Sequence, residues 1–452
     1  MKDRNIILLP AVLATGIMSF SGVLIETAMN VTFPTLIKEF DLATRDVQWV
    51  TTIYLLVISI MVPFANYLIK NYSIRRLFII ANLFFISGLI TDFLASGFLI
   101  LLAGRFLQGI STGIALPLMF HIILTYSPME KRGTMMGIGT LTTSIAPAIG
   151  PTYGGLLTTL LSWHYIFLLL LPVLLLSLIT GLYAIGDLPV KKSGQLDIFS
   201  LLFLALLFSG LLIFFNQFSL VALLCGLIGL LLFLRQSQHV NSPLVSLKVL
   251  KNHSFVLFLL GFLVCQFLLL GISFILPNFV QIVLKDNAFI AGLVMLPGAA
   301  IGAIAAPVSG RMLDKYGAKS PILFGLTLAL IGWLGLLLSL SNPSLFVFVC
   351  GHVIYSFGLG FAYSNMMTSG MNLLTKKEYG DGNTLFNTLQ QFSGAVATSI
   401  TASIISIFQQ RQIDYQTGTT LGSQVAMSVL LTMLVLIFIS CIFHFKKINK
   451  KL

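Results

Sequence analysis

Ionisable side chains are rare in the apolar stretches of this sequence, and those that occur there are the first candidates for chemistry. Glu26, Asp92 and Arg105 each lie inside a long run of apolar residues. If these runs cross a membrane, each buried charge costs about 3 kcal/mol on insertion scales and by default marks a functional site. Such residues could bind and release protons or pair with a charged substrate.

Glu26 is the strongest of these candidates because it follows a long uncharged stretch. Ser19, Gly22, Asn30 and Phe33 recur with it at helical spacing, so a small and polar stripe surrounds the acid. Burial would favour its protonated form, and a cationic substrate nearby would favour the ionised form and release the proton. This competition is the simplest mechanism for exchanging a proton against a substrate. The alternative is a protonated acid that only bonds a neighbouring helix.

Arg105 shares a helical face with Gln108 and Thr112, at offsets of three and seven residues. A buried guanidinium needs acceptors or a counter-charge, and we expect Glu26 or backbone carbonyls of the first helix to supply them. The alternative is a structural hydrogen-bond hub between helices. Asp92 lies close to the end of its apolar run, and we interpret it as an interfacial acid in contact with water.

The segments that carry these residues must be membrane helices. Of all residues 57% are hydrophobic and 9% are charged, whereas a soluble protein carries about 25% charged residues. A helix of about 20 apolar residues spans the hydrocarbon core, in which open strands cannot satisfy their backbone groups. We predict an all-α membrane protein with fourteen spans, at residues 6–37, 47–69, 76–96, 98–126, 133–160, 163–186, 198–216, 218–235, 253–284, 288–309, 320–340, 344–374, 384–408 and 424–445.

The basic residues orient these spans. With a cytoplasmic N-terminus, the inner segments hold 21 of the 26 Lys and Arg residues and the outer segments hold 4. This asymmetry predicts a protein of the cytoplasmic (plasma) membrane with both termini in the cytoplasm. The net charge of +12 is spread in small groups between the spans, so we expect contact with the lipid bilayer and no nucleic-acid partner.

A weak internal repeat divides the chain. Residues 66–75, after the second span, resemble residues 310–319, after the tenth. Two parallel halves of this kind are typical of transporters. We predict a six-helix bundle over residues 1–186, two inserted helices with cytoplasmic linkers over residues 187–252, and a second six-helix bundle over residues 253–452.

Further candidates would gate the protein or line a central cavity. Glycines let helices approach closely and prolines kink them, which suits a moving interface but also fits simple tight packing; this pattern comprises Pro147, Gly150, Pro151, Gly154 and Gly155. Polar side chains within spans would contact substrate or, alternatively, bond neighbouring helices; they are Asn30, Gln108, Thr112, Asn278, Gln281, Asn365 and Asn387.

Several segments in order give the chain a resemblance to the drug:proton antiporters of the major facilitator superfamily, most closely their fourteen-helix branch. Residues 24–34 resemble the first-helix motif of this branch, with Glu26 where an aspartate is common. Residues 105–109 match motif B, whose arginine is implicated in proton coupling, and residues 146–155 match motif C, which is associated with antiport. The resemblance implies two six-helix bundles plus two extra helices around a cavity that opens to each side in turn.

The chain departs from this family's pattern at two places. Motif A is degraded after the second span, where Asn66 replaces its glycine, Lys70 its aspartate and Ser73 its second glycine, whereas its copy at residues 310–319 is intact. Gln390 stands where an arginine is expected. In the family, motif A ties the cytoplasmic helix ends together. The intact copy therefore predicts conformational gating by Gly310, Arg311, Asp314 and Gly317, with Asp314 paired to Arg311, Lys315 or a helix N-terminus.

From this resemblance we expect a proton-coupled antiporter that exports lipophilic, cationic drugs by alternating access. The proton gradient would drive it without a cofactor, since the sequence has no glycine-lysine loop for ATP, and it would act as a monomer. The alternatives are an exporter of an endogenous lipid or metabolite, a proton symporter and a membrane-embedded enzyme. We expect no enzyme, because no metal-ligand cluster, nucleophile motif or pair of acids at catalytic spacing is present.

Overall fold

The computed structural model describes residues 6–187, 196–240, 244, 247–375 and 378–449. Within these ranges, the side chains of residues 129–134, 136–138, 140–144 and 448–449 are not described. Part of the charge asymmetry therefore falls outside the described residues or side chains, namely Lys2, Arg4, Lys131, Arg132, Lys191, Lys192, Lys376, Lys377, Lys450 and Lys451.

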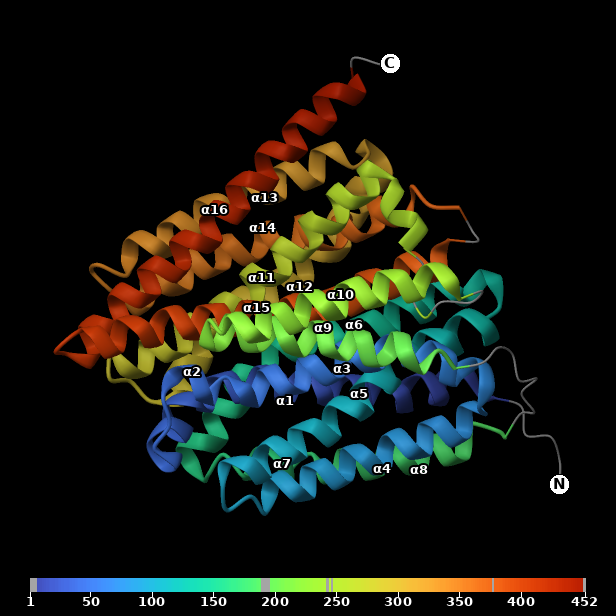
Figure 1. The fold of residues 1–452 in the computed structure, drawn as a ribbon, viewed down its shortest axis with the longest axis horizontal. Coiled ribbons are helices and arrows are strands. Elements are labelled where there is room, and N and C mark those ends of the chain that lie inside the picture. The colour runs from blue at the N-terminus through green and yellow to red at the C-terminus, as the bar shows by residue number, and fades with distance from the viewer. Residues whose placement is uncertain (1–5, 188–195, 241–243, 245–246, 376–377, 450–452) are drawn as a thin grey trace. The chain divides into compact units, whose positions relative to one another are not determined.

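The described chain consists of helices and their connections (Figure 1). The part before residue 187 contains α1 (Leu8–Phe40), α2 (Thr44–Val47), α3 (Trp49–Asn71), α4 (Ile74–Phe93), α5 (Phe98–Tyr126), α6 (Met129–Leu160), α7 (Tyr165–Leu168) and α8 (Leu171–Ala184). Two helices follow, α9 (Ile198–Gln217) and α10 (Leu220–His239), and then a 3-10 turn, η1 (Leu247–Lys251). The last part contains α11 (His253–Ile282), α12 (Ala288–Tyr316), α13 (Lys319–Ser339), α14 (Leu345–Met371), α15 (Tyr379–Arg411) and α16 (Tyr415–Asn449).

The predicted all-helical membrane fold is confirmed. Among the described residues, 13 helices are long and apolar enough to cross a membrane. The remaining predicted span, residues 133–160, falls on α6, most of whose first half has no described side chains. Several helices extend beyond their predicted apolar cores, as α16 does on both sides of residues 424–445. Apolarity marks only the hydrocarbon part of a helix, and polar end turns continue it into the interface.

Short polar side chains begin several helices. Asn252 Oδ1 accepts from the backbone N–H groups of Ser254, at 3.1 Å, and Phe255, at 3.2 Å, where α11 starts. Asn287 Oδ1 accepts from the Ile290 N–H at 2.9 Å at the start of α12. These bonds satisfy donors that the first turn of a helix leaves unpaired, so they fix where each helix begins.

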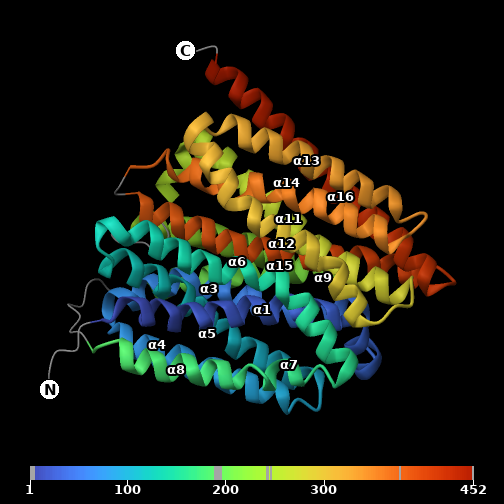
Figure 2. The same ribbon diagram turned by 180° about the vertical axis from the view of Figure 1, so that it is seen from behind.

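The chain forms two compact units. Unit 1 comprises Met1–Met29, Trp49–Phe214 and Phe218–Val245, and unit 2 comprises Asn30–Gln48, Phe215–Gln217 and Ser246–Leu452. In unit 1, α5 packs closely on α3 and α4, and α4 also lies beside α8 (Figures 1 and 2). In unit 2, α14 packs closely on α12 and α13, and α11 packs on α15.

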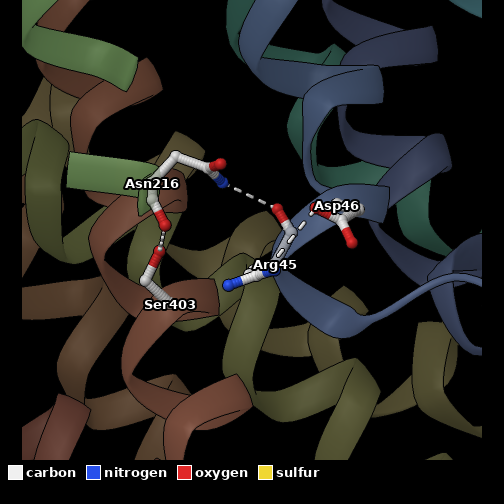
Figure 3. A network of polar contacts seen from close by, with 4 residues as sticks. All are labelled: Arg45, Asp46, Asn216 and Ser403. Atoms are coloured by element: carbon white, nitrogen blue, oxygen red, sulfur yellow. Dashed lines mark hydrogen bonds and ion pairs between the residues drawn. The ribbon is translucent and has the colours of Figure 1, made fainter. Parts of the chain in front are cut away.

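The end of α9 belongs to unit 2 and is held there by a polar network (Figure 3). The Asn216 side-chain Nδ2 donates to the backbone carbonyl of Arg45, at 2.9 Å, and the backbone carbonyl of Asn216 accepts from the Ser403 hydroxyl of α15, at 3.3 Å. Arg45 also pairs with Asp46 at 3.7 Å. The network joins three segments that are far apart in the sequence: α2, α9 and α15.

Candidate functional site

Glu26 is buried in unit 1, in the middle of α1. One helical turn earlier, a Cβ on Gly22 would lie 2.5 Å from Thr112 Oγ1 and 2.6 Å from the Tyr54 hydroxyl. The absence of a side chain at Gly22 therefore lets α1 approach α3 and α5 closely. Because positions four residues apart share a helix face, Glu26 lies on the same side of α1 as this approach.

Arg105 is fully buried on α5 and finds its acceptors on α3 and on its own helix. Its Nε donates to the Val50 carbonyl at 3.0 Å, and its Nη1 donates to Gln108 Oε1 at 2.6 Å. The guanidinium carbon lies 4.1 Å from the centre of the Tyr54 ring, in a cation–π contact. The expectation that the first helix would supply a carbonyl is therefore wrong, because α5 packs on α3 at this level.

Glu26 and Arg105 interact through space without touching. Each acts electrostatically on the other. The ion pairs found among the described residues do not include these two side chains. The positive charge thus stabilises an ionised Glu26 from a distance, while the hydrogen bonds of Arg105 go to uncharged groups.

The interpretation of Asp92 as an interfacial acid is wrong. It is fully buried rather than in contact with water, and its Oδ2 accepts from Gln108 Nε2 at 2.7 Å. A Cβ on Gly104 would collide with the Asp92 carboxylate, and one on Gly88 would lie 2.8 Å from the Gly104 carbonyl. The two glycines let α4 and α5 touch, which turns Asp92 inward. A signal was available: Gly88 lies four residues before Asp92, on the same helix face.

Tyr54 joins the site although the sequence did not single it out as a site residue. It is buried on α3, and its hydroxyl donates to Thr112 Oγ1 at 3.0 Å. With Arg105 over its ring, Tyr54 connects the two ends of the face formed by Arg105, Gln108 and Thr112. The site in unit 1 is therefore a continuous polar network on α3, α4 and α5, beside Glu26 of α1.

The glycines of α6 contact α1 directly next to Glu26. A Cβ on Gly150 would lie 2.9 Å from the Leu24 carbonyl, and one on Gly154 would lie 2.8 Å from Ala28 Cα. Gly155 and Pro151 are also buried on α6, and Pro147 is partly exposed. The helix continues through both prolines. The pattern therefore brings the backbone of α6 against α1 on both sides of the acid.

The polar candidates of unit 2 bond backbone groups in this conformation. Gln281 Nε2 donates to the Val31 carbonyl at 2.8 Å, and Asn278 Nδ2 donates to the Phe274 carbonyl of its own helix at 2.6 Å. Asn365 Nδ2 donates to the carbonyls of Phe361 and Ser309. Asn30 is buried on α1, and Asn387 bonds Asn383 within α15.

Gln390 belongs to a second polar group in unit 2 that the sequence did not identify. Its Nε2 donates to the Tyr363 hydroxyl at 2.6 Å, and that hydroxyl donates to Gln266 Oε1 at 2.5 Å. The Tyr363 ring stacks on Phe262 with 4.4 Å between ring centres. A neutral group of one hydroxyl and two amides therefore stands where an arginine was expected.

The intact motif A lies at the exposed end of α12. Gly317 follows this helix with a φ of 72°, a conformation that favours glycine, and its N–H donates to the Leu313 carbonyl at 2.9 Å. Asp314 and Arg311 are both exposed, and Gly310 has open space around it. In this conformation Asp314 makes no ion pair among the described residues, and Lys315 lies over the Tyr316 ring. The pairing expected in the state in which motif A ties the helix ends together stays a prediction.

Three comparisons connect this chain to known transporters. It is 33% identical over 416 residues to the lincomycin resistance protein LmrB of Bacillus subtilis (strain 168), covering 89% of this chain and 86% of the relative. It is 24% identical over 411 residues to the riboflavin transporter RibZ of Clostridioides difficile (strain 630), covering 90% and 89%. A solved bacterial homologue of the human lysosomal transporter Spinster, inward-facing and unoccupied, shares the fold with a TM-score of 0.68 at 14% identity, over 95% of this chain and 96% of that one.

The family follows from a match over most of the chain. Residues 15–398 match the Major Facilitator Superfamily, which confirms the resemblance given by the sequence motifs. The same match shows a transporter rather than an enzyme. The chain belongs to the Major Facilitator Superfamily and is a multi-pass membrane transporter of the type that includes drug exporters.

Proposed function

We propose that this transporter is a proton-coupled antiporter that exports lipophilic, cationic drugs by alternating access. The observation that carries the proposal is the buried Glu26, on which Arg105 acts electrostatically without forming an ion pair with it. A buried carboxyl group without a direct counter-ion is stable in its neutral, protonated form. A substrate cation that approaches it stabilises the carboxylate and displaces the proton.

Arg105 assists this exchange by supplying a fixed positive charge. Its Nε and Nη1 donate to Val50 and Gln108, and its plane faces Tyr54. The charge therefore stays in place while Glu26 gains or loses its proton. In the ionised state Glu26 has a partner at a distance, which lowers the cost of releasing the proton inside the membrane. The neutral state needs no partner.

The relatives support export of a drug, since the lincomycin resistance protein is named for that phenotype and aligns with most of this chain. We propose that the protein acts as a monomer in the cytoplasmic membrane with both termini in the cytoplasm, as the basic residues between spans predict. The proton gradient would drive transport without a cofactor. One charge moving through 100 mV contributes about 2.3 kcal/mol.

Reconstituted vesicles test the proposal. A pH-sensitive dye is trapped inside, a pH gradient is imposed, and a quaternary ammonium cation is added to wild type and to Glu26→Gln. We expect proton movement on cation addition with wild type and its loss in the variant, because an amide cannot carry a proton. Glu39→Gln, which removes an exposed carboxylate near the end of the same helix, is the matched control and should behave as wild type.

A second candidate is the transport of an endogenous metabolite, which the similarity to the riboflavin transporter favours. The same vesicles separate the two functions. If no cation moves protons but a flavin does, the substrate is a metabolite. If both proteins exchange cations equally, Glu26 does not couple transport to protons, and the proposal is rejected.

A further inference from the structure

The second half of the chain has its own counterpart of Arg105. Arg105 is the eighth residue of α5, and His352 is the eighth residue of α14. Each follows a glycine, Gly104 in the first half and Gly351 in the second. The two helices occupy corresponding places in the internal repeat, so His352 stands where the first half has its buried guanidinium.

The surroundings of the two residues also correspond. The sequence offset that relates Asn66 to Gly310 also relates Asp92 to Leu336. In unit 1 a Cβ on Gly104 would meet Asp92; in unit 2 a Cβ on Gly351 would lie 2.9 Å from the Leu336 side chain. The helix pair α13 and α14 therefore repeats the close approach of α4 and α5.

The same offset relates Gly88 to Gly332. A Cβ on Gly88 would lie 2.7 Å from the side chain of Gln108, and one on Gly332 would lie 2.8 Å from Cβ of Tyr355. Gln108 lies three residues after Arg105 on α5, and Tyr355 lies three residues after His352 on α14. The α4–α5 contact of the first half and the α13–α14 contact of the second half therefore correspond at three pairs of residues. Arg105 corresponds to His352, Asp92 to Leu336 and Gly88 to Gly332.

The chemistry of the second site differs because it has neither the carboxylate nor the guanidinium of the first site. Leu336 replaces the carboxylate of Asp92, and by the same offset Gly298 replaces Tyr54. A Cβ on Gly298 would overlap the His352 ring, 2.6 Å from Cε1 and 2.8 Å from Cγ, so the imidazole packs on the backbone of α12. A side chain at residue 298 would fill this space.

His352 is buried and only partly satisfied. It is 3% exposed, and its Nε2 lies 3.3 Å from the Ser356 hydroxyl. Its Nδ1 has no hydrogen-bond partner among the described residues, and neither has the buried Tyr355 hydroxyl. An imidazolium carries two N–H donors and needs two acceptors. The site supplies one, so the packed conformation accommodates the neutral ring and not the cation.

No charged group compensates for the burial of His352 within the described residues. On α12, Arg311, Asp314 and Lys315 begin more than three turns beyond Gly298, and on α13 Lys319 lies at the far end from Leu336. On α16 the titratable groups Cys441, His444, Lys446 and Lys447 lie almost four turns or more beyond Met427, which accepts from Trp333 beside this site. The titratable groups nearby on α14 are Cys350, which is exposed, and Tyr355. Cys265 of α11 and Tyr363 of α14 both act on Tyr355.

We propose that His352 is a second proton-binding site, located in the opposite half of the transporter from Glu26. The ring is neutral while α12 packs on α14 at Gly298. When the two helices separate there, water reaches the ring and a proton adds to the ring nitrogen that carries no hydrogen. Water and the Ser356 hydroxyl then accept from the two N–H groups of the imidazolium. Protonation therefore shifts the protein toward the separated conformation. The inference does not depend on proton exchange at Glu26.

Trp333 offers a reporter for this site. Its ring centre lies 5.2 Å from that of Tyr355, which lies 6.1 Å from that of His352. The chain has two other tryptophans, and Trp163 stacks on His164, so both are replaced by Phe in a Trp49→Phe, Trp163→Phe background. The emission of full-length protein in lipid nanodiscs is then measured from about pH 8 to about pH 5, the range in which histidine titrates.

We expect the Trp333 emission to fall on acidification and this response to be lost in both His352→Gln and His352→Asn. Two amides of different length keep the test informative if one variant does not fold. His121→Gln, which removes a histidine of α5, is the matched control and should keep the response. A titration that persists in either His352 variant contradicts the proposal. So does a flat profile in the parent, because His352 would then stay neutral throughout.

Discussion

At the scale of single residues, a neutral amide separates the two charges of the first-half network. Gln108 accepts from Arg105 at its Oε1 and donates to Asp92 through its Nε2. Both ends of the amide are thereby used, and the guanidinium and the carboxylate are joined without a direct ion pair. This arrangement leaves the positive charge of Arg105 to act on Glu26, which is the interaction that the proposed proton exchange needs.

The role of this amide is testable by Gln108→Ala. The change leaves Arg105 Nη1 and Asp92 Oδ2 without these partners inside the membrane, and it should lower the free energy of unfolding by about 2 kcal/mol. Thermal unfolding of the purified protein measures the loss. The control is Thr91→Ala, which removes an exposed hydrogen bond to Ser87 on α4 and should change little. Equal stability of the two variants would show that Gln108 does not hold the network.

At the scale of helices, the length and order of the elements follow from the sequence because each apolar run is long enough to span a bilayer. The direction in which a side chain points does not follow so easily. Asp92 lies near the end of its run, which suggested water contact, yet Gly88 and Gly104 bring α5 over it. Position along a helix gives depth in the membrane, whereas burial depends on the helix that packs alongside.

The contacts of Arg105 also depend on the neighbouring helix. Its burial and its bond to Gln108 were predictable from helical spacing. Its acceptor on α3 was not, because only the packing of α3 against α5 places the Val50 carbonyl there. His352 was missed because its equivalence to Arg105 becomes evident only when the two halves are compared helix by helix.

The contact of α6 with α1 gives a prediction at this scale. Gly154→Ala places a methyl group against Ala28 at the backbone, so one of the two helices must move. We expect overpacking to cost about 1 to 3 kcal/mol of unfolding free energy. The control is Gly335→Ala on α13, where a Cβ meets open space and alanine should stabilise the helix slightly. Thermal unfolding compares the two, and a tolerated Gly154→Ala would contradict close packing at this point.

At the scale of the whole molecule, two halves with one architecture have diverged in chemistry. The first half places an acid, an amide and a guanidinium at the α4–α5 contact, whereas the second places Leu336, Tyr355 and His352 at the α13–α14 contact. The feature common to both halves is the close helix packing that glycines permit. Each half therefore buries a different ionisable group, Arg105 or His352, within the same helix packing.

Motif A keeps its acidic residue only in the second half of the chain. It provides the prediction that concerns the whole transport cycle. The first-half copy has Lys70 in place of its acid, so the acidic function rests on Asp314. In this conformation Asp314 is exposed and makes no ion pair among the described residues. Its carboxylate should therefore act in the other conformation, in which the helix ends close together.

Asp314→Asn should slow transport and leave substrate binding intact. A surface ion pair contributes at most about 1 kcal/mol, so losing it from one state of the cycle should reduce turnover by up to about fivefold. Turnover is measured in reconstituted vesicles, and binding is measured by titration of the purified protein with the transported cation. Asp187→Asn removes an exposed acid after α8 and should change neither quantity. Unchanged turnover in Asp314→Asn would place the gate elsewhere, and a parallel loss of binding would make Asp314 a folding or substrate contact rather than a gating residue.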